Sequence, residues 1–167
     1  VGPAYLATDT HWTPGAMDAV ARALAERLGD LAVLSTTGAP PARDEGRAIS
    51  GRGDLAAMLD LPEGADRYPP ETVTTHPADR RGAGAEVLLL GDSFANIYAS
   101  QALGWGRDAG LAERLAAHLG APVGALIRND DGAFATRLEL ARELARGRDP
   151  LAGTRVVVWE LAARELS

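Results

Sequence analysis

The sequence predicts a three-layer α/β/α sandwich built on a mostly parallel sheet. Short apolar segments alternate along the chain with amphipathic segments of helical spacing, the pattern typical of parallel sheets covered by helices. The chain has 167 residues, of which 46% are hydrophobic and 24% charged, as in an ordinary globular protein. We therefore expect a single domain over residues 1–167. Because the chain opens abruptly at Val1, we also expect it to be a piece of a longer anchored or secreted protein.

Composition excludes several classes of chemistry. The chain has no cysteine, which excludes disulfides, thiolate metal sites and cysteine nucleophiles. All 17 basic residues are arginine, which excludes a lysine Schiff base and a P-loop lysine. The net charge of −6 argues against a nucleic-acid partner, because phosphate contacts need a basic face. No apolar run approaches the ~20 residues of a membrane span, and no signal peptide is visible.

The first predicted helix begins after Thr13, which can act as its N-cap, with Pro14 at the first helical position. Gly29 follows its last turn. A short strand is expected over residues 31–35. Residues 36–84 are expected to form a long irregular excursion, because prolines and glycines interrupt every pattern there except a short helix at 54–61.

The second half of the chain has clearer elements. Its apolar runs predict strands over residues 86–90, 122–127 and 155–161. Its periodic segments predict helices over residues 94–103, 106–119 and 135–146.

The segment Gly91-Asp92-Ser93 places a serine between a buried strand and a helix. Catalytic groups of open α/β sheets gather at such strand ends, and the helix N-terminus offers unpaired N–H groups for an oxyanion. The alternative for a lone Gly-Asp-Ser tripeptide is a serine that only caps the helix.

Asp9 and His11 form the second candidate group. Two residues apart in an extended segment, their side chains point the same way, so the carboxylate can hold the imidazole tautomer of a general base. The alternative is a histidine that is merely hydrogen-bonded near the helix entry. Together with Ser93, the pair supplies the nucleophile, the base and the orienting carboxylate of a catalytic triad.

Four segments of this chain resemble the alginate O-acetyltransferase family, whose members are SGNH-hydrolase-like. They are residues 8–14 (TDTHWTP), 88–98 (LLLGDSFANIY), 128–137 (RNDDGAFATR) and 157–165 (VVWELAARE). The order of Asp-x-His before Gly-Asp-Ser resembles the circularly permuted order of that family. The resemblance covers both ends and most of the second half, and residues 36–84 carry none of it.

The resemblance implies an O-acetyltransferase that passes an acetyl group through an acetyl-serine to hydroxyls of a bacterial exopolysaccharide. By motif matching, Ser93 is the nucleophile and oxyanion donor, His11 the base and Asp9 its orienter. Asn129 is a candidate second oxyanion donor, or else a turn residue, since Asn-Asp-Asp-Gly is turn chemistry.

Four further residues are candidates for substrate binding. A flat aromatic ring suits a sugar face, and arginine suits a uronate carboxylate. These residues are Trp159, Arg164, Tyr98 and Arg128. The alternatives are packing for Trp159 and Tyr98, and pairing with Asp130 or Asp131 for Arg128.

The resemblance also implies the protein's surroundings. It implies a periplasmic protein, anchored to the inner membrane through a segment outside this chain. Its partners would be a polysaccharide, a membrane-bound acetyl-donating acyltransferase and other exopolysaccharide assembly proteins. We expect no cofactor and no metal, because one Asp-x-His pair without a third ligand has poor zinc spacing. The alternatives are a carbohydrate acetylesterase with the same triad and a non-catalytic polysaccharide-binding assembly subunit.

Overall fold

The computed structural model describes residues 2–31, 33–35, 45–60, 68–79 and 84–163. Within them, the main sheet has three parallel strands in the order β4-β3-β5: β3 (Val87–Gly91), β4 (Val123–Ile127) and β5 (Val156–Trp159). The central strand β3 is buried along its whole length, as its continuous apolar run predicts. The carboxyl ends of all three strands meet at one edge of the sheet, where Gly91 pairs with Ile127 and Leu90 with Trp159.

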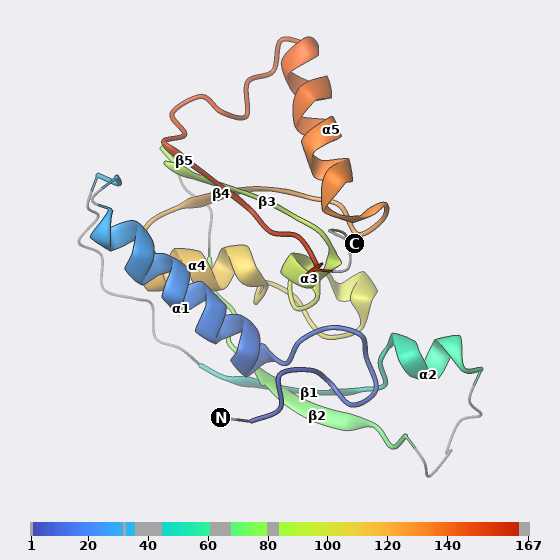
Figure 1. Cartoon of the computed structure of the whole chain (residues 1–167). Coiled ribbons are helices and arrows are strands. Elements are labelled where there is room, and N and C mark those ends of the chain that lie inside the picture. The colour runs from blue at the N-terminus through green and yellow to red at the C-terminus, as the bar shows by residue number, and fades with distance from the viewer. Residues whose placement is uncertain (1, 32, 36–44, 61–67, 80–83, 164–167) are drawn as a thin grey trace.

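Helices cover both faces of this sheet (Figure 1). Helix α5 (Gly132–Ala145) packs on β3 and β4 from one side. Helices α1 (Pro14–Asp30) and α4 (Leu111–Leu119) pack against each other on the opposite side. The predicted three-layer α/β/α sandwich with a parallel sheet is confirmed.

The core lies between the sheet and the α1–α4 pair. Val87 and Leu89 of β3 face this side and are almost fully buried. The largest side chains packed with them are Met17, Ile97, Tyr98, Trp105, Leu111 and Leu115. Burial of these apolar surfaces is the main force that holds the layers together.

The strand expected over residues 31–35 is wrong for its described members. Leu31 ends α1 as its C-cap, with its N–H bonded back to the Arg27 carbonyl at 3.1 Å. Ser35 donates its N–H to the Glu86 side chain at 2.6 Å rather than to a neighbouring strand. None of the described residues of this segment pairs with a strand of the sheet, because Leu31 caps the helix and Ser35 bonds to a side chain.

The excursion expected over residues 36–84 contains regular structure in its described part. Strands β1 (Arg47–Gly51) and β2 (Glu71–Thr75) pair antiparallel, with Arg47 opposite Thr75. Between them lies the short helix α2 (Asp54–Met58), which projects from the body of the molecule in Figure 1. The β-branched run Thr72 to Thr75 was the signal for β2. The remaining parts, 36–44, 61–67 and 80–83, lie outside the described residues.

Two predicted helices were too long. Instead of one helix over 94–103, the chain forms α3 (Ser93–Asn96) and a 3₁₀ turn, η1 (Gln101–Leu103), because Ser100 is extended between them. Helix α4 begins at Leu111 rather than at 106, because Gly106 has a φ of 106° that a helix does not allow.

Candidate active site

A hairpin-like turn near the N-terminus presents Asp9 and His11. Tyr5 and Trp12 form an antiparallel bridge, and the Leu6 N–H donates to the His11 carbonyl at 3.0 Å. The Thr13 N–H closes the turn by donating to the Ala4 carbonyl at 2.9 Å. We call residues 8–11, at the tip of this turn, the Asp-His loop.

The structure brings this loop to Ser93, 82 positions later in the chain. The His11 Nε2 lies 2.9 Å from the Ser93 Oγ. On the other side of the ring, the His11 Nδ1 lies 2.5 Å from the Asp9 Oδ1, which also accepts the His11 backbone N–H at 3.0 Å. A base within hydrogen-bond reach of a nucleophile, itself oriented by a carboxylate, is the geometry of a Ser-His-Asp triad.

The turn between β3 and α3 sets the position of Ser93. Asp92 caps the helix by accepting the Phe94 N–H at 2.7 Å. Ser93 is the first helical residue, so its own N–H has no acceptor inside the helix and suits an oxyanion. Gly91 makes the turn possible, because a Cβ there would lie 2.7 Å from the Ala95 Cβ.

Asp9 is buried and fully hydrogen-bonded. Its Oδ2 accepts the Trp105 Nε1–H at 2.7 Å and the Asp54 N–H at 3.2 Å. Burial by itself raises the pKa of Asp9, but the hydrogen bonds from His11, Trp105 and Asp54 outweigh it and lower the pKa to about 2. Asp9 is therefore a carboxylate at neutral pH.

Trp12 attaches the Asp-His loop to α3. Its Nε1–H donates to the Phe94 carbonyl at 2.9 Å, and its own carbonyl accepts the Tyr98 hydroxyl at 2.7 Å. The Phe94 ring also lies 4.7 Å from the His11 ring, centroid to centroid. These contacts explain why an aromatic residue follows the histidine.

Tyr98 is therefore a correction to the predicted substrate contacts. It is 0% exposed, and its hydroxyl is bonded inside the molecule. Burial, together with the nearby carboxylates of Asp9 and Glu71, raises the pKa of Tyr98 above its ordinary value. Its role in the structure is to hold the Trp12 carbonyl, next to the Asp-His loop, by this hydrogen bond.

Asn129 and Arg128 follow β4 at the same edge of the sheet as Ser93. The Asn129 Oδ1 accepts the Asn96 Nδ2–H at 2.9 Å, which ties Asn129 to the last residue of α3. The Arg128 guanidinium pairs with Asp130 at 2.9 Å and lies 3.7 Å from Glu139. The Asp130 pairing anticipated as the alternative for Arg128 is thus formed.

Trp159 ends β5 on the face of the sheet that α5 covers. The residue is 37% exposed, and its ring meets the Phe134 ring edge-on at 5.7 Å. The Arg137 guanidinium lies over both rings, at 5.5 Å from Phe134 and 5.4 Å from Trp159. Arg164 lies outside the described residues.

A cleft of about 280 Å³ opens beside the triad. Its walls are Tyr5, Thr10, Trp12, Phe94, Glu160 and residues 161–163. Glu160 also supports the turn before Ser93, since its carboxylate accepts the Asp92 N–H at 3.1 Å.

Sequence reasoning missed four supporting residues. They are Asp54, Glu71, Trp105 and Glu160, which contact the triad segments from distant parts of the chain. No local pattern marks them, because their role depends on tertiary contacts. Asp54 also corrects the expectation that the Asp-x-His pair has no third potential metal ligand beside it. Ligand atoms of Asp9, His11 and Asp54 lie within 4.8 Å of one another, so a third acidic group does stand beside the Asp-x-His pair.

A serine at the end of the central parallel strand, contacted by a histidine and an aspartate from the Asp-His loop, is the arrangement of an α/β domain of the serine-hydrolase type. Comparison with known families matches residues 1–163 to the family described as "SGNH hydrolase-like domain, acetyltransferase AlgX". The chain belongs to this family, which confirms the resemblance seen in its motifs.

Individual relatives are consistent with this family assignment. The chain is 35% identical over 95 residues to the probable alginate O-acetylase AlgJ of Pseudomonas putida, covering 53% of this chain and 24% of that protein. The solved O-acetyltransferase domain of Pseudomonas putida AlgJ is 26% identical with a TM-score of 0.73, covering 99% of this chain and 55% of that one. Pseudomonas aeruginosa AlgX, 19% identical with a TM-score of 0.58 over 95% of this chain and 37% of that one, shares the fold. The chain thus covers about half of the solved AlgJ structure, and the 95 aligned residues cover about a quarter of the full AlgJ protein.

Proposed function

We propose that this domain is an O-acetyltransferase that moves an acetyl group through an acetyl-serine on Ser93 to hydroxyls of an alginate-like bacterial exopolysaccharide. The observation that carries the proposal is the 2.9 Å contact between the Ser93 Oγ and the His11 Nε2, in a chain of an acetyltransferase family. The name of the relative AlgJ, a probable alginate O-acetylase, supports alginate as the type of acceptor.

The first half-reaction loads the serine. The His11 Nε2 takes the proton of the Ser93 hydroxyl while the Oγ attacks the carbonyl carbon of the donor's acetyl group. The resulting oxyanion accepts a hydrogen bond from the Ser93 N–H. When the tetrahedral intermediate collapses, the bond to the donor breaks and His11 returns the proton to the leaving group.

The second half-reaction transfers the acetyl group from Ser93 to the sugar. A sugar hydroxyl gives its proton to the His11 Nε2 and attacks the acetyl-serine carbonyl. The ester bond to Ser93 then breaks, and the Ser93 Oγ recovers a proton from His11. In both halves, the Asp9 carboxylate holds the Nδ1–H tautomer and stabilises the imidazolium.

Asn129 remains our candidate for a second oxyanion donor. Its side-chain oxygen is occupied by Asn96 at 2.9 Å, which leaves the Nδ2–H groups of Asn129 for an oxyanion. Its place after β4 puts it at the sheet edge that carries Ser93.

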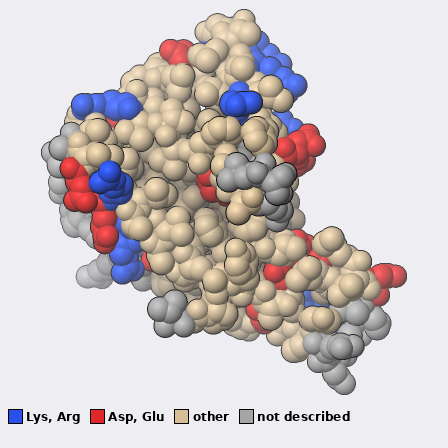
Figure 2. Space-filling model, in the orientation of Figure 1, with Lys and Arg blue, Asp and Glu red and all other residues tan. Residues whose placement is uncertain are grey.

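The exposed ring of Trp159 supports a saccharide-binding role at this same edge. Together with Phe134 it offers an aromatic surface for a sugar face. Arginines gather over α5 in Figure 2. Several of them are paired with Glu139 or Glu143, whereas Arg137 stacks on the rings and has no carboxylate partner among the described residues. Arg137 is therefore better placed than the paired Arg128 to meet a uronate. Arg164 stays a candidate from the sequence.

The cleft beside the triad suits the acetyl donor or the acceptor hydroxyl, because Phe94 and Trp12 on its wall adjoin Ser93 and His11. We propose a membrane-bound acyltransferase as the source of the acetyl group, a periplasmic location, and other exopolysaccharide assembly proteins as partners. The family membership supports these proposals. None of the helices formed by the described residues is long and apolar enough to cross a membrane.

The first test uses p-nitrophenyl acetate as the donor. We expect wild-type protein to release nitrophenol and Ser93→Ala to lose that activity, while Ser100→Ala, at a serine without a side-chain cap bond, keeps it. Uronate or glucose oligomers in the same reaction are weighed by mass spectrometry. A Ser93-dependent gain of one acetyl group identifies a transferase.

Two other outcomes of this assay would favour the alternative functions. Ser93-dependent release with no oligomer modified identifies an acetylesterase, because water alone then unloads the serine. Equal release by Ser93→Ala and wild type contradicts the catalytic proposal and favours a polysaccharide-binding assembly subunit.

A further inference from the structure

The Asp54 carboxylate, at the start of α2, lies against the Asp-His loop. Its Oδ1 accepts the Thr10 N–H at 2.7 Å, and its Oδ2 accepts the Thr10 hydroxyl at 2.5 Å. The same Oδ2 lies 4.0 Å from the His11 Nδ1. One side chain thus takes both polar hydrogens of the residue that precedes the histidine.

The backbone before and after Asp54 binds the loop as well. The Asp54 N–H donates to the Asp9 Oδ2 at 3.2 Å, and the Leu55 N–H donates to the Thr8 carbonyl at 3.1 Å. The Gly53 N–H donates to the Thr8 hydroxyl at 3.1 Å. These contacts fix the position of the start of α2 relative to the loop.

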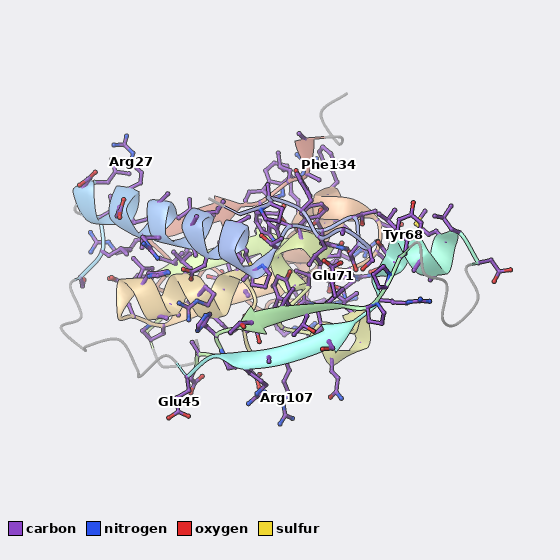
Figure 3. The ribbon with its side chains drawn as sticks, turned by 90° about the horizontal axis from the view of Figure 1, so that it is seen from below. Arg27, Glu45, Tyr68, Glu71, Arg107 and Phe134 are labelled. Atoms are coloured by element: carbon purple, nitrogen blue, oxygen red, sulfur yellow. The ribbon has the colours of Figure 1, made fainter. Side chains whose placement is uncertain are left out.

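Glu71, the first residue of β2, supports the same loop from a second point. Its Oε1 accepts the Thr8 N–H at 2.9 Å and the Thr8 hydroxyl at 2.6 Å, and its Oε2 accepts the Ala7 N–H at 3.2 Å. In Figure 3, Glu71 lies on the side of β2 that faces the rest of the molecule, whereas Arg107 points away from it. The β1–α2–β2 segment therefore contacts the loop at two points, the start of α2 and the start of β2.

We propose that Asp54 is a positioning residue of the active site, which acts on His11 through Thr10. The inference rests on the proposed function of the triad. Fixing Thr10 fixes the backbone that carries His11, so the ring stays aligned between Asp9 and Ser93. The Asp54 charge also faces the nitrogen that is part of an imidazolium during turnover, and a carboxylate at that distance stabilises it.

A metal ion is the other use that the residues Asp9, His11 and Asp54 allow. Their ligand atoms are occupied, however. The His11 Nδ1 is bonded to Asp9, and both oxygens of Asp54 accept hydrogens from Thr10. This hydrogen bonding favours the positioning role over a metal site.

The test compares Asp54→Ala, Asp54→Asn and Thr10→Ala with the control Asp60→Asn. Asp60 is exposed in the same segment, and its φ of 49° is one that asparagine tolerates. We expect Asp54→Ala to lower kcat for p-nitrophenyl acetate roughly 10- to 100-fold with KM little changed. Asp54→Asn keeps an acceptor for Thr10 and should recover part of the loss. Thr10→Ala should lose activity in the same direction, and Asp60→Asn should match the wild type.

A second readout does not depend on turnover. The proton between His11 Nδ1 and Asp9 Oδ1 should give a far-downfield proton NMR resonance, which Asp9→Asn abolishes. We expect Asp54→Ala to shift or broaden this resonance and Asp60→Asn to leave it in place. If the wild type has no Ser93-dependent activity, the function proposal fails, and this resonance still decides whether Asp54 orders His11.

Three results would overturn the inference. One is an unchanged kcat and resonance in folded Asp54→Asn and Thr10→Ala. The second is a loss confined to KM. The third is an activity that a chelator removes and Zn²⁺ restores in the wild type but not in Asp54→Ala, which would make the cluster a metal site.

Discussion

At the residue scale, Asp9 is the group on which the site depends most. One buried carboxylate accepts two hydrogens from His11, one from Trp105 and one from the Asp54 backbone. Burial opposes its charge, and the hydrogen bonds more than compensate, so the pKa of Asp9 is lowered to about 2. A carboxylate with this pKa is ionised at neutral pH.

The lowered pKa of Asp9 predicts a pH-dependent contribution to stability. Since the pKa is lower in the folded state than the ~3.9 of an unfolded aspartate, the contribution is complete above about pH 4 and is lost as pH falls towards about 2. It is on the order of 2 kcal/mol. Urea unfolding of wild type and Asp9→Asn should give a gap in unfolding free energy at pH 7 that narrows between pH 4 and pH 2. A gap independent of pH would mean that the Asp9 charge is not what stabilises the fold.

At the element scale, the start of α2 is packed against the Asp-His loop with no room for a side chain. Gly53 is buried, and a Cβ there would lie 2.2 Å from the Asp9 Cβ and 2.4 Å from the Thr8 carbonyl oxygen. The neighbours are backbone or the root of a buried side chain, so they cannot move aside cheaply. Glycine at this position is what lets α2 and the loop share hydrogen bonds.

Gly53→Ala should therefore push α2 away from the loop. We expect a loss of about 1–3 kcal/mol in the free energy of unfolding, together with reduced Ser93-dependent turnover. The matched control is Gly29→Ala, near the end of α1, where nothing lies within 4 Å of the added Cβ. That variant should be neutral or slightly more stable, because alanine favours a helix. Denaturant titration and the p-nitrophenyl acetate assay check both. Equal stability and turnover of the two variants would contradict the close packing of Gly53 against the Asp-His loop.

At the scale of the whole molecule, β3 contributes both to the packing of the layers and to the position of Ser93. It is the central strand of the main sheet, it is buried on both faces, and it ends at the turn that carries Ser93. Leu89 in its middle is 0% exposed and packs in the core between the sheet and the α1–α4 pair. The stability of the sheet and the position of Ser93 thus depend on the same strand.

Leu89→Ala should destabilise the whole domain by about 2–5 kcal/mol, through lost apolar burial and a cavity. Met58→Ala, at a 74% exposed side chain of α2, should stay within about 0.5 kcal/mol of the wild type. Thermal unfolding followed by circular dichroism measures both. A small loss for Leu89→Ala would mean that the core collapses around the missing side chain.

Much of the architecture was predictable because it follows from local patterns. The alternation of apolar and amphipathic segments predicted the layers, and the continuous apolar run of β3 predicted a buried strand. The Thr13 cap and Pro14 predicted where α1 begins. The strand at 31–35 failed because an apolar run by itself does not say whether a neighbouring strand will accept its hydrogen bonds.

For the candidate site, the sequence by itself determined which residue types stand at the strand end and before the first helix: Ser93, His11 and Asp9. Tertiary structure decided their distances and the environment that ionises Asp9. It also decided that Tyr98 is buried and that Asp54 and Glu71 hold the Asp-His loop. The physical reason is that, apart from the bonds between Asp9 and His11, these contacts join residues some 44 to 96 positions apart, and no local periodicity encodes such a pairing.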